Sequence, residues 1–268
     1  MKKVRRCTEV ILLLVFAISL TVILRRAFDQ RRAAEDASDA ARLAGLTGQE
    51  IIEPSGGHEE ASGEGPYDGP LAGLNLDALQ AVNEDVAGWV EIPDTPLSYP
   101  LVQGEDNQFY LNHSWKKEPG SVGAVFLEQA NSRDLTGFHI LIYGHRMRDG
   151  TMFGSLRGYK EQDYWQEHPS VYLADKGGVR RYDIFAAHEA KVNGMVYYLD
   201  MEDHGLEEEF IQYCMERSVI DTGIVPKADD QILTLSTCTA RGYKARWVVH
   251  AVLAQEFASH SNAKSKTP

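Results

Sequence analysis

The segment that decides the fold spans residues 231–253 and reads QILTLSTCTARGYKARWVVHAVL. Two apolar runs rich in β-branched residues, ILTLSTC and WVVHAVL, enclose the polar run TARGYK. This composition predicts two strands, which form a hairpin if they pair with each other. In that arrangement Cys238 ends the first strand and Arg246 begins the second, so that both lie beside the connecting loop.

Further strand-like runs precede this pair, and each is bounded by Gly, Pro, Asn or Asp. They are residues 89–92, LSYPLVQ, GAVFLEQ, HILIYGH, SVYLADK and RRYDIFAAHEAKV. Amphipathic helices are predicted for TMFGSLRGYKEQDYWQEH and LEEEFIQYCMERSV, and LNLDALQAVNEDV has helical spacing before the first strand. Many strands with few helices predict a mainly β fold, a closed or nearly closed barrel with helices on its outside.

The N-terminal region predicts a membrane anchor. Residues 10–24, VILLLVFAISLTVIL, carry no charge, with four basic residues before them and four after. This run is short for a spanning helix of roughly 17 to 25 residues, but counting from Cys7 brings it into range. A cleaved signal peptide would need small residues at its cleavage site, whereas Arg25 and Arg26 follow directly. An uncleaved signal anchor is therefore favoured, and the basic residues on both flanks leave its orientation open.

Composition divides the chain into four predicted parts. The second part carries nine acidic residues against Arg42 alone and is rich in Ala, Gly and Ser, which predicts a solvated spacer. Its beginning, AAEDASDAARLAGL, could carry the membrane helix onward. The four parts are the basic flank with the membrane anchor (1–32), the spacer (33–73), a compact domain (74–258) and a polar tail (259–268).

Charge and cysteine content exclude several classes of protein. The net charge is −12, although residues 1–32 are basic, so the rest of the chain is strongly acidic and nucleic acid is not expected as a partner. Three cysteines, Cys7, Cys214 and Cys238, are too few and too scattered for a disulfide scaffold. No C-x-x-C spacing suggests structural zinc, and at least one thiol is expected to be free.

Cys238 is the candidate nucleophile. It ends a strand and faces a loop, where a thiol is reachable, and Arg241, Lys244 and Arg246 follow within eight residues. Positive charge near a thiol stabilises the thiolate, which is the reactive form. A small buried hydrophobic residue is the commoner explanation of a single cysteine, so the argument depends on these neighbours.

His145 and Arg246 are the candidate partners of this thiol. His145 closes HILIYGH before the polar loop RMRDG, and a strand end gives an imidazole a rigid base and an open side for proton transfer. Arg246 would hold its guanidinium beside the thiol, where it could stabilise an oxyanion, and Arg241 competes for this role. Other histidines, including His139 and His250, are more simply surface or packing residues.

The run TLSTC, with YGH upstream and an Arg opening an apolar strand downstream, resembles the catalytic signature of sortases. The likeness extends over about residues 83–254 and is to class B sortases in particular. NEDVAGWVEIPDTPLSYPLVQGEDNQFYLNHSW resembles their domain opening, GAVFLEQAN their next strand, and ILIYGHRMRDGTMFGSLRGY their histidine strand. The resemblance implies an eight-stranded sortase-type β-barrel with peripheral helices, preceded by one transmembrane helix.

The resemblance also implies the chemistry: a membrane-anchored cysteine transpeptidase that cleaves an Asn-Pro-x-Thr-like sorting signal of a secreted protein after the threonine. Cys238 attacks and forms an acyl thioester, and His145 protonates the departing amine and later accepts a proton from the incoming one. Arg246 holds the carbonyl oxygen with help from the backbone N–H of Thr239. The amine of a lipid-linked peptidoglycan precursor then takes the acyl group. No cofactor or metal is expected.

Four substrate-binding residues and a topology follow from the same resemblance. The residues are Asn107 and Leu111 in DNQFYL and Ser236 and Thr237 in LSTC. Without the resemblance, Asn107 could cap a helix, Leu111 could belong to the core, and the other two could simply alternate along a strand. The family implies a catalytic domain outside a Gram-positive type cell and a cytoplasmic N-terminus. Its members often carry an acidic residue directly after the thiol, and TARGYK has none.

Three alternatives remain open from the sequence. A sortase that polymerises pilin subunits would use a lysine amine as the second nucleophile. A cysteine hydrolase would release the acyl group to water, although papain-like enzymes place Cys before His, the reverse of this chain. A catalytically inert, membrane-tethered binding module would keep the barrel and predicts an unreactive Cys238.

Overall fold

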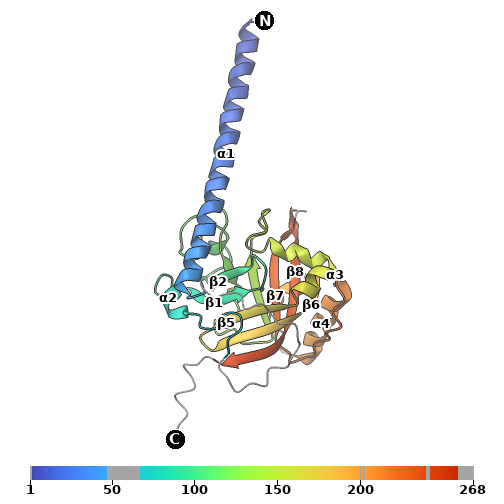
Figure 1. The fold of residues 1–268 in the computed structure, drawn as a ribbon. Coiled ribbons are helices and arrows are strands. Elements are labelled where there is room, and N and C mark those ends of the chain that lie inside the picture. Colours follow the sequence, from blue (N-terminus) through green and yellow to red (C-terminus); the bar gives the residue numbers. More distant parts are fainter. Residues whose placement is uncertain (1, 47–66, 200, 202, 240–241, 259–268) are drawn as a thin grey trace.

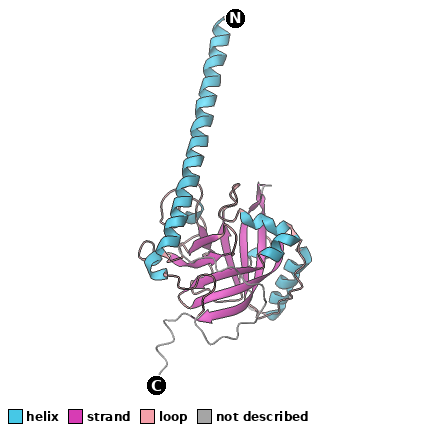
Figure 2. Ribbon diagram, in the orientation of Figure 1, coloured by secondary structure: helices cyan, strands magenta, loops and turns pink. Residues whose placement is uncertain are grey.

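The computed structural model describes residues 2–46, 67–199, 201, 203–239 and 242–258, with residues 2–10, 26, 238–239 and 242–244 described by their backbone alone. Eight strands close into a barrel in the order β1-β2-β3-β4-β7-β8-β6-β5 (Figures 1 and 2). The strands are β1 (Val86–Glu91), β2 (Ser98–Val102), β3 (Val125–Leu127), β4 (His139–Gly144), β5 (Ser170–Asp175), β6 (Gly178–Lys191), β7 (Ile232–Thr239) and β8 (Gly242–Ala258). The predicted eight-stranded barrel is confirmed.

Two of the strand pairings are parallel, β2 with β3 and β4 with β7, and the remaining six are antiparallel. β7 and β8 form the hairpin expected from residues 231–253. Because β7 is parallel to β4 and antiparallel to β8, its C-terminal end meets the end of β4 and the start of β8. Three chain segments far apart in sequence therefore converge at one rim of the barrel.

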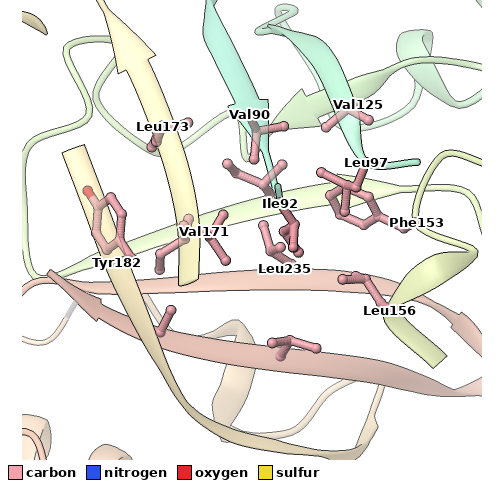
Figure 3. Packing of buried hydrophobic residues seen from close by; sticks show 14 of the residues in the cluster. Val90, Ile92, Leu97, Val125, Phe153, Leu156, Val171, Leu173, Tyr182 and Leu235 are labelled. Atoms are coloured by element: carbon pink, nitrogen blue, oxygen red, sulfur yellow. The ribbon is translucent and has the colours of Figure 1, made fainter. Parts of the chain in front are cut away.

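The barrel interior is filled by alternate residues from strands all around it. Val90 of β1, Val125 of β3, Val171 of β5 and Leu235 of β7 point into one cluster and are almost fully buried (Figure 3). Period-two alternation explains this pattern, since every second residue of a strand faces the same side. The residues between them face outward, where the functional side chains lie.

Apart from the long N-terminal helix, the helices are short and lie outside the barrel (Figure 2). They are α2 (Leu76–Gln80), α3 (Gln162–Glu167) and α4 (His204–Arg217), with 3-10 segments η1 (Phe109–Leu111), η2 (Ser155–Lys160) and η3 (Met195–Tyr197). The single helix expected for residues 151–168 is divided into η2 and α3. Its break falls at Glu161, which has an extended backbone, after Gly158, whose Cα packs against the Tyr164 ring. The two pieces thus pack against each other instead of continuing as one helix.

Helix α1 (Lys2–Leu43) continues through the apolar run into the first part of the predicted spacer. Its final turns pack on the barrel, where Asp36, Ala40 and Ala44 are buried. Trp115 donates from Nε1 to the Asp36 carbonyl over 3.0 Å, and Lys116 forms ion pairs with Asp36 at 2.9 Å and Asp39 at 3.0 Å. These residues are therefore docked rather than solvated, and residues 47–66 of the predicted spacer lie outside the described chain.

The N-terminal part of α1 projects away from the barrel (Figure 1). Its apolar side chains are exposed from Ile11 to Leu24, and an 18-residue window has a mean hydropathy of 2.2. By length and composition, α1 is able to cross a membrane.

Gly144 allows close packing at the end of β4 and gives a testable prediction. A Cβ added at this position would lie 2.6 Å from Cγ of Phe153, whose ring is fully buried and cannot move aside. We expect Gly144→Ala to destabilise the fold by about 1–3 kcal/mol through overpacking. Thermal unfolding of the detergent-solubilised chain measures this, with Gly120→Ala as the control because a Cβ there meets nothing within 4 Å. Equal midpoints for both variants would contradict the packing argument.

Candidate active site

The register of β7 brings the three candidate catalytic positions to one rim. Tyr143 and Gly144 of β4 pair with Ser236 and Thr237 of β7, and His145 follows directly after this last pair. On the other side of β7, Cys238 is the register partner of Arg246 in β8. The backbone of the candidate nucleophile thus lies between the candidate acid/base and the candidate oxyanion residue. The side chains of Cys238 and Thr239 lie outside the described part of the structure, as does all of Arg241.

A partly open groove lies at this rim. Its lining brings together His145, Arg246 and all four predicted substrate residues. The full lining is Asn107, Leu111, Phe126, Tyr143, Gly144, His145, Ser236, Thr237 and Arg246.

The ring of His145 is oriented by a loop that precedes β3. Its Nε2 lies 2.7 Å from the carbonyl oxygen of Leu111, and because a carbonyl only accepts, Nε2 carries the hydrogen. Nδ1 is therefore the nitrogen left to exchange a proton. Gly123 makes room for the ring, since it has a φ of +66° and a Cβ there would come 3.0 Å from His145 Cδ2 and 2.6 Å from a backbone oxygen. A side chain at this position would displace the imidazole.

Arg246 is half-buried and lines the groove. It does not open the strand as expected, because β8 already begins at Gly242. Its Nη1 donates to the carbonyl of the neighbouring Ala245 over 3.3 Å, so that most of its donors remain available within the described structure. The charge of Arg246 is close enough to Tyr143 to act against the rise in pKa of that phenol. The guanidinium can therefore stabilise negative charge that develops near the Cys238 backbone.

Asn107 is held firmly on the opposite wall. Its Oδ1 accepts from the backbone N–H of Gln129 over 2.8 Å, and its Nδ2 donates to the carboxylate of Glu128. It is not the helix cap that was one possible interpretation. The N-cap of η1 is Gln108, which makes no side-chain capping bond, and Asp106 accepts from the backbone N–H groups of Gln108 and Phe109.

Glu128 also orients a second groove residue, Tyr143. The Tyr143 hydroxyl donates to the other carboxylate oxygen of Glu128 over 2.7 Å. Burial raises the pKa of this hydroxyl, and the adjacent Glu128 carboxylate raises it further, so Tyr143 stays protonated and remains a donor. One carboxylate thus fixes Asn107 and Tyr143 relative to each other.

The network continues to β7 through the segment that precedes α4. Tyr143 stacks with Tyr197, with ring centroids 6.5 Å apart and planes 7° from parallel. The Tyr197 hydroxyl then lies 3.0 Å from the Ser236 Oγ. A continuous set of contacts therefore runs from Asn107 through Glu128 and the two tyrosines to β7, the strand that carries Cys238.

Leu111 and Thr237 complete the wall in different ways. Leu111 is 42% exposed, so it is not the core residue that was one possible interpretation. Thr237 is buried, and among the described residues its Oγ1 has no hydrogen-bond partner. An exposed apolar side chain such as Leu111 is suited to contact with a ligand. The Thr237 hydroxyl is itself buried, so within the described structure it supports the wall from behind.

Sequence reasoning missed Glu128, Tyr143 and Tyr197. Tyr143 is inside the YGH motif, and alternation along β4 places it outward between the buried Ile142 and Gly144, so it could have been found. Tyr197 comes from a distant segment, and no local pattern indicates its contact with Ser236. Two groups of potential metal ligands occur elsewhere in the described chain, but neither of them lies in the groove.

Comparisons with known proteins identify the family of this chain. The sortase domain family matches residues 90–254, which is more than half of the chain. Sortase B of Listeria monocytogenes is 35% identical over 181 residues, covering 65% of this chain and 72% of that protein. Sortase B of Staphylococcus aureus is 29% identical over 163 residues, covering 61% and 67%.

Solved structures give the same result. A Staphylococcus aureus sortase B-substrate complex matches with a TM-score of 0.64 and 28% identity, covering 67% of this chain and 84% of that one. Sortase B from B. anthracis in complex with AAEK1 matches with a TM-score of 0.69 and 26% identity, covering 85% and 99%. The chain therefore belongs to the sortase family and is a class B sortase, a cysteine transpeptidase.

Proposed function

We propose that this class B sortase cleaves an Asn-Pro-x-Thr-like sorting signal of a secreted protein after the threonine and joins that protein to an amine of the peptidoglycan. The observation that carries the proposal is the groove in which His145, Arg246 and the predicted substrate residues meet beside the Cys238 backbone. The similarity to a structure described as a sortase B-substrate complex supports it.

Cys238 is the proposed nucleophile. Its thiolate attacks the threonine carbonyl carbon, and the C–N bond to the next residue breaks as His145 gives a proton to the departing amine. The product of this half is an acyl thioester and a free C-terminal peptide. The incoming amine then attacks the thioester, His145 takes up its proton, and the Cys238 thiolate leaves. Nδ1 of His145 suits both transfers, because Nε2 is occupied by Leu111.

Arg246 is proposed to hold the carbonyl oxygen as it becomes negative. It stands directly across from Cys238 in the hairpin register, and it is half-buried, where a charge acts more strongly than in open water. The backbone N–H of Thr239 is the proposed second donor.

The peptide is proposed to lie along the wall formed by Asn107, Leu111, Ser236 and Thr237. The two contacts of Asn107 to Gln129 and Glu128 leave it one N–H and one lone pair for the backbone or amide of a substrate. Leu111 offers an apolar surface of the kind a proline ring contacts. No cofactor takes part in this scheme.

The proposed location is the cell membrane, with α1 crossing it once from a cytoplasmic N-terminus to a catalytic domain outside. The exposed apolar stretch of α1 supports this arrangement. The proposed second substrate is a lipid-linked peptidoglycan precursor, which is confined to the same surface. Tethering both partners there raises their effective concentration without additional contacts.

The test of this function uses the full chain in detergent with a library of Asn-Pro-x-Thr peptides, with and without a glycine-type amine. Intact-mass analysis should detect a covalent adduct on the enzyme and an amine-joined product, both lost in Cys238→Ala. Transfer to a lysine amine only would favour the pilin-polymerising alternative. Folded protein without adduct or cleavage across the library would favour an inert binding module.

Substitution of the catalytic candidates should give a graded series of rates. Cys238→Ala should abolish turnover, and His145→Ala should nearly do so, because each removes a group that takes part in bond making. Arg246→Ala should cost about two to three powers of ten, as the loss of an oxyanion donor does. Arg241→Ala is the matched control and should matter far less. Steady-state peptide cleavage measures all four, and comparable losses for both arginines would refute the assignment to Arg246.

Glu128 should affect binding more than chemistry, because it orients Asn107 and Tyr143 but does not line the groove itself. We expect Glu128→Ala to raise KM about tenfold with little change in kcat, through two lost hydrogen bonds of about 0.5–1.5 kcal/mol each. Glu128→Gln keeps the shape and should recover part of the loss. Glu105→Ala, at an exposed carboxylate near Asn107, is the control. A fall in kcat alone would show that Glu128 does not act by positioning.

A further inference from the structure

A cluster of buried polar side chains lies under α4, outside the catalytic groove. His139 of β4, His188 of β6 and His250 of β8 are at most 2% exposed, and Cys214 of α4 is fully buried. They come from four different elements and meet on the outer face of the sheet that α4 covers. None of them has a role in the proposed transpeptidation.

Hydrogen bonds fix the protonated nitrogen of two of these rings. His139 Nδ1 lies 3.0 Å from the Tyr198 carbonyl and must donate to it, so His139 Nε2 is the acceptor in a neutral ring. Nε2 is 2.8 Å from the Thr234 hydroxyl, which therefore donates its hydrogen to His139. The same hydroxyl oxygen then accepts from His250 Nδ1 over 2.9 Å.

The consequence is a lone pair on His250 Nε2, and this lone pair faces His188 Nε2 at 3.1 Å. A hydrogen on His188 Nε2 would satisfy the pair, but it would leave His188 Nδ1 as a buried lone pair. A hydrogen on His188 Nδ1 instead leaves two Nε2 lone pairs facing each other. A cation between them resolves that arrangement.

A shared proton is a poor candidate for this cation. It would place an uncompensated positive charge among side chains that are at most 2% exposed. A metal ion that also binds a thiolate would carry less net charge there.

The third ligand is the thiol of Cys214. Ligand atoms of His188, His250 and Cys214 all lie within 4.8 Å of one another. Two nitrogens 3.1 Å apart fit one ion with bonds of about 2.0–2.1 Å and an angle near about 100°. The sulfur would need to approach by on the order of 1 Å to complete the site. Burial raises the pKa of the Cys214 thiol well above its usual value, and the charge of Arg217 at the end of α4 opposes this rise only in part. A bound metal ion would itself have to displace the thiol proton.

We propose that His188, His250 and Cys214 bind a single copper(I) ion. The donor set is two imidazoles and a thiolate, which are ligands that suit a soft metal ion. Charge decides between ions: copper(I) and one thiolate form a neutral unit, whereas zinc(II) would leave one positive charge in an apolar surrounding. Zinc also takes a fourth ligand, and the group offers three.

Copper at this position would fasten α4 to β6 and β8. The segment leading into α4 carries Tyr197, which contacts Ser236 in the groove, and Tyr198, whose carbonyl accepts from His139. The site is therefore structural, and it stabilises the element that supports one wall of the groove. It does not depend on the identity of the sorting signal.

The test uses the full chain in detergent with Cys7→Ser and Cys238→Ala, so that Cys214 is the only thiol, purified without a histidine tag. Copper(I) is added anaerobically in competition with bicinchoninate. We expect one equivalent to be withheld from the chelator and the midpoint of thermal unfolding to rise by about 5–10 °C. X-ray absorption at the copper edge should show one sulfur and two nitrogen ligands.

Three further variants in the same background make the test specific. Cys214→Ala leaves the hydrogen bonds of the histidines intact and should abolish both the binding and the stabilisation, and His188→Asn should do the same. His204→Asn is the control, since the exposed His204 belongs to a group with the buried Glu207 and the exposed Asp229. Carboxylates are hard ligands, so this group should not retain copper(I). Undiminished binding in Cys214→Ala, no sulfur in the X-ray absorption spectrum, or tighter retention of zinc than of copper(I) would each overturn the proposal.

Discussion

The pairing of β7 with β4 on one side and β8 on the other is the constraint on which the rest of the structure depends. Strand β7 is parallel to β4 and antiparallel to β8. One rim of the barrel therefore contains the end of β4, the end of β7 and the start of β8. A slip of one residue in either pairing would move Arg246 or His145 along the rim and send the buried Leu235 outward. The core and the catalytic rim are therefore specified by the same register.

The outer face of these strands has two environments. Near the rim it is open and forms the groove, with Ser236 and Tyr143 in contact with side chains from loops. Farther along the strands α4 covers it, and Thr234 and His250 are fully buried there. In the open part Tyr143 and Ser236 bond to Glu128 and Tyr197, and in the covered part Thr234 bonds to His139 and His250. A single sheet face thus supports both an accessible reaction site and a dry polar cluster.

Much of the fold follows from local pattern, because alternation of apolar residues marks each strand and the polar loop marks the hairpin. The TLSTC and YGH motifs likewise identify two strand ends that meet. Other features depend on contacts between distant segments. The acidic residues and small side chains of residues 33–46 predict a solvated segment. The same small side chains allow α1 to lie close to Trp115. The hydrogen bond between Glu128 and Asn107 and the contact between His188 and His250 form only when the chain has folded.

The rigid attachment of α1 has a mechanical consequence. Its last turns are bound to the barrel by the Trp115 bond and the Lys116 ion pairs, and the helix is continuous from there to the apolar run. From Leu24 to Asp36 it rises about 18 Å, which would set a fixed height for the groove if α1 spans the membrane as proposed. Any tilt of α1 in the membrane would then rotate the whole barrel through the same angle. The groove of such an enzyme meets substrates only within a thin layer at one height above the lipid surface. A flexible tether would allow it a wider range of heights.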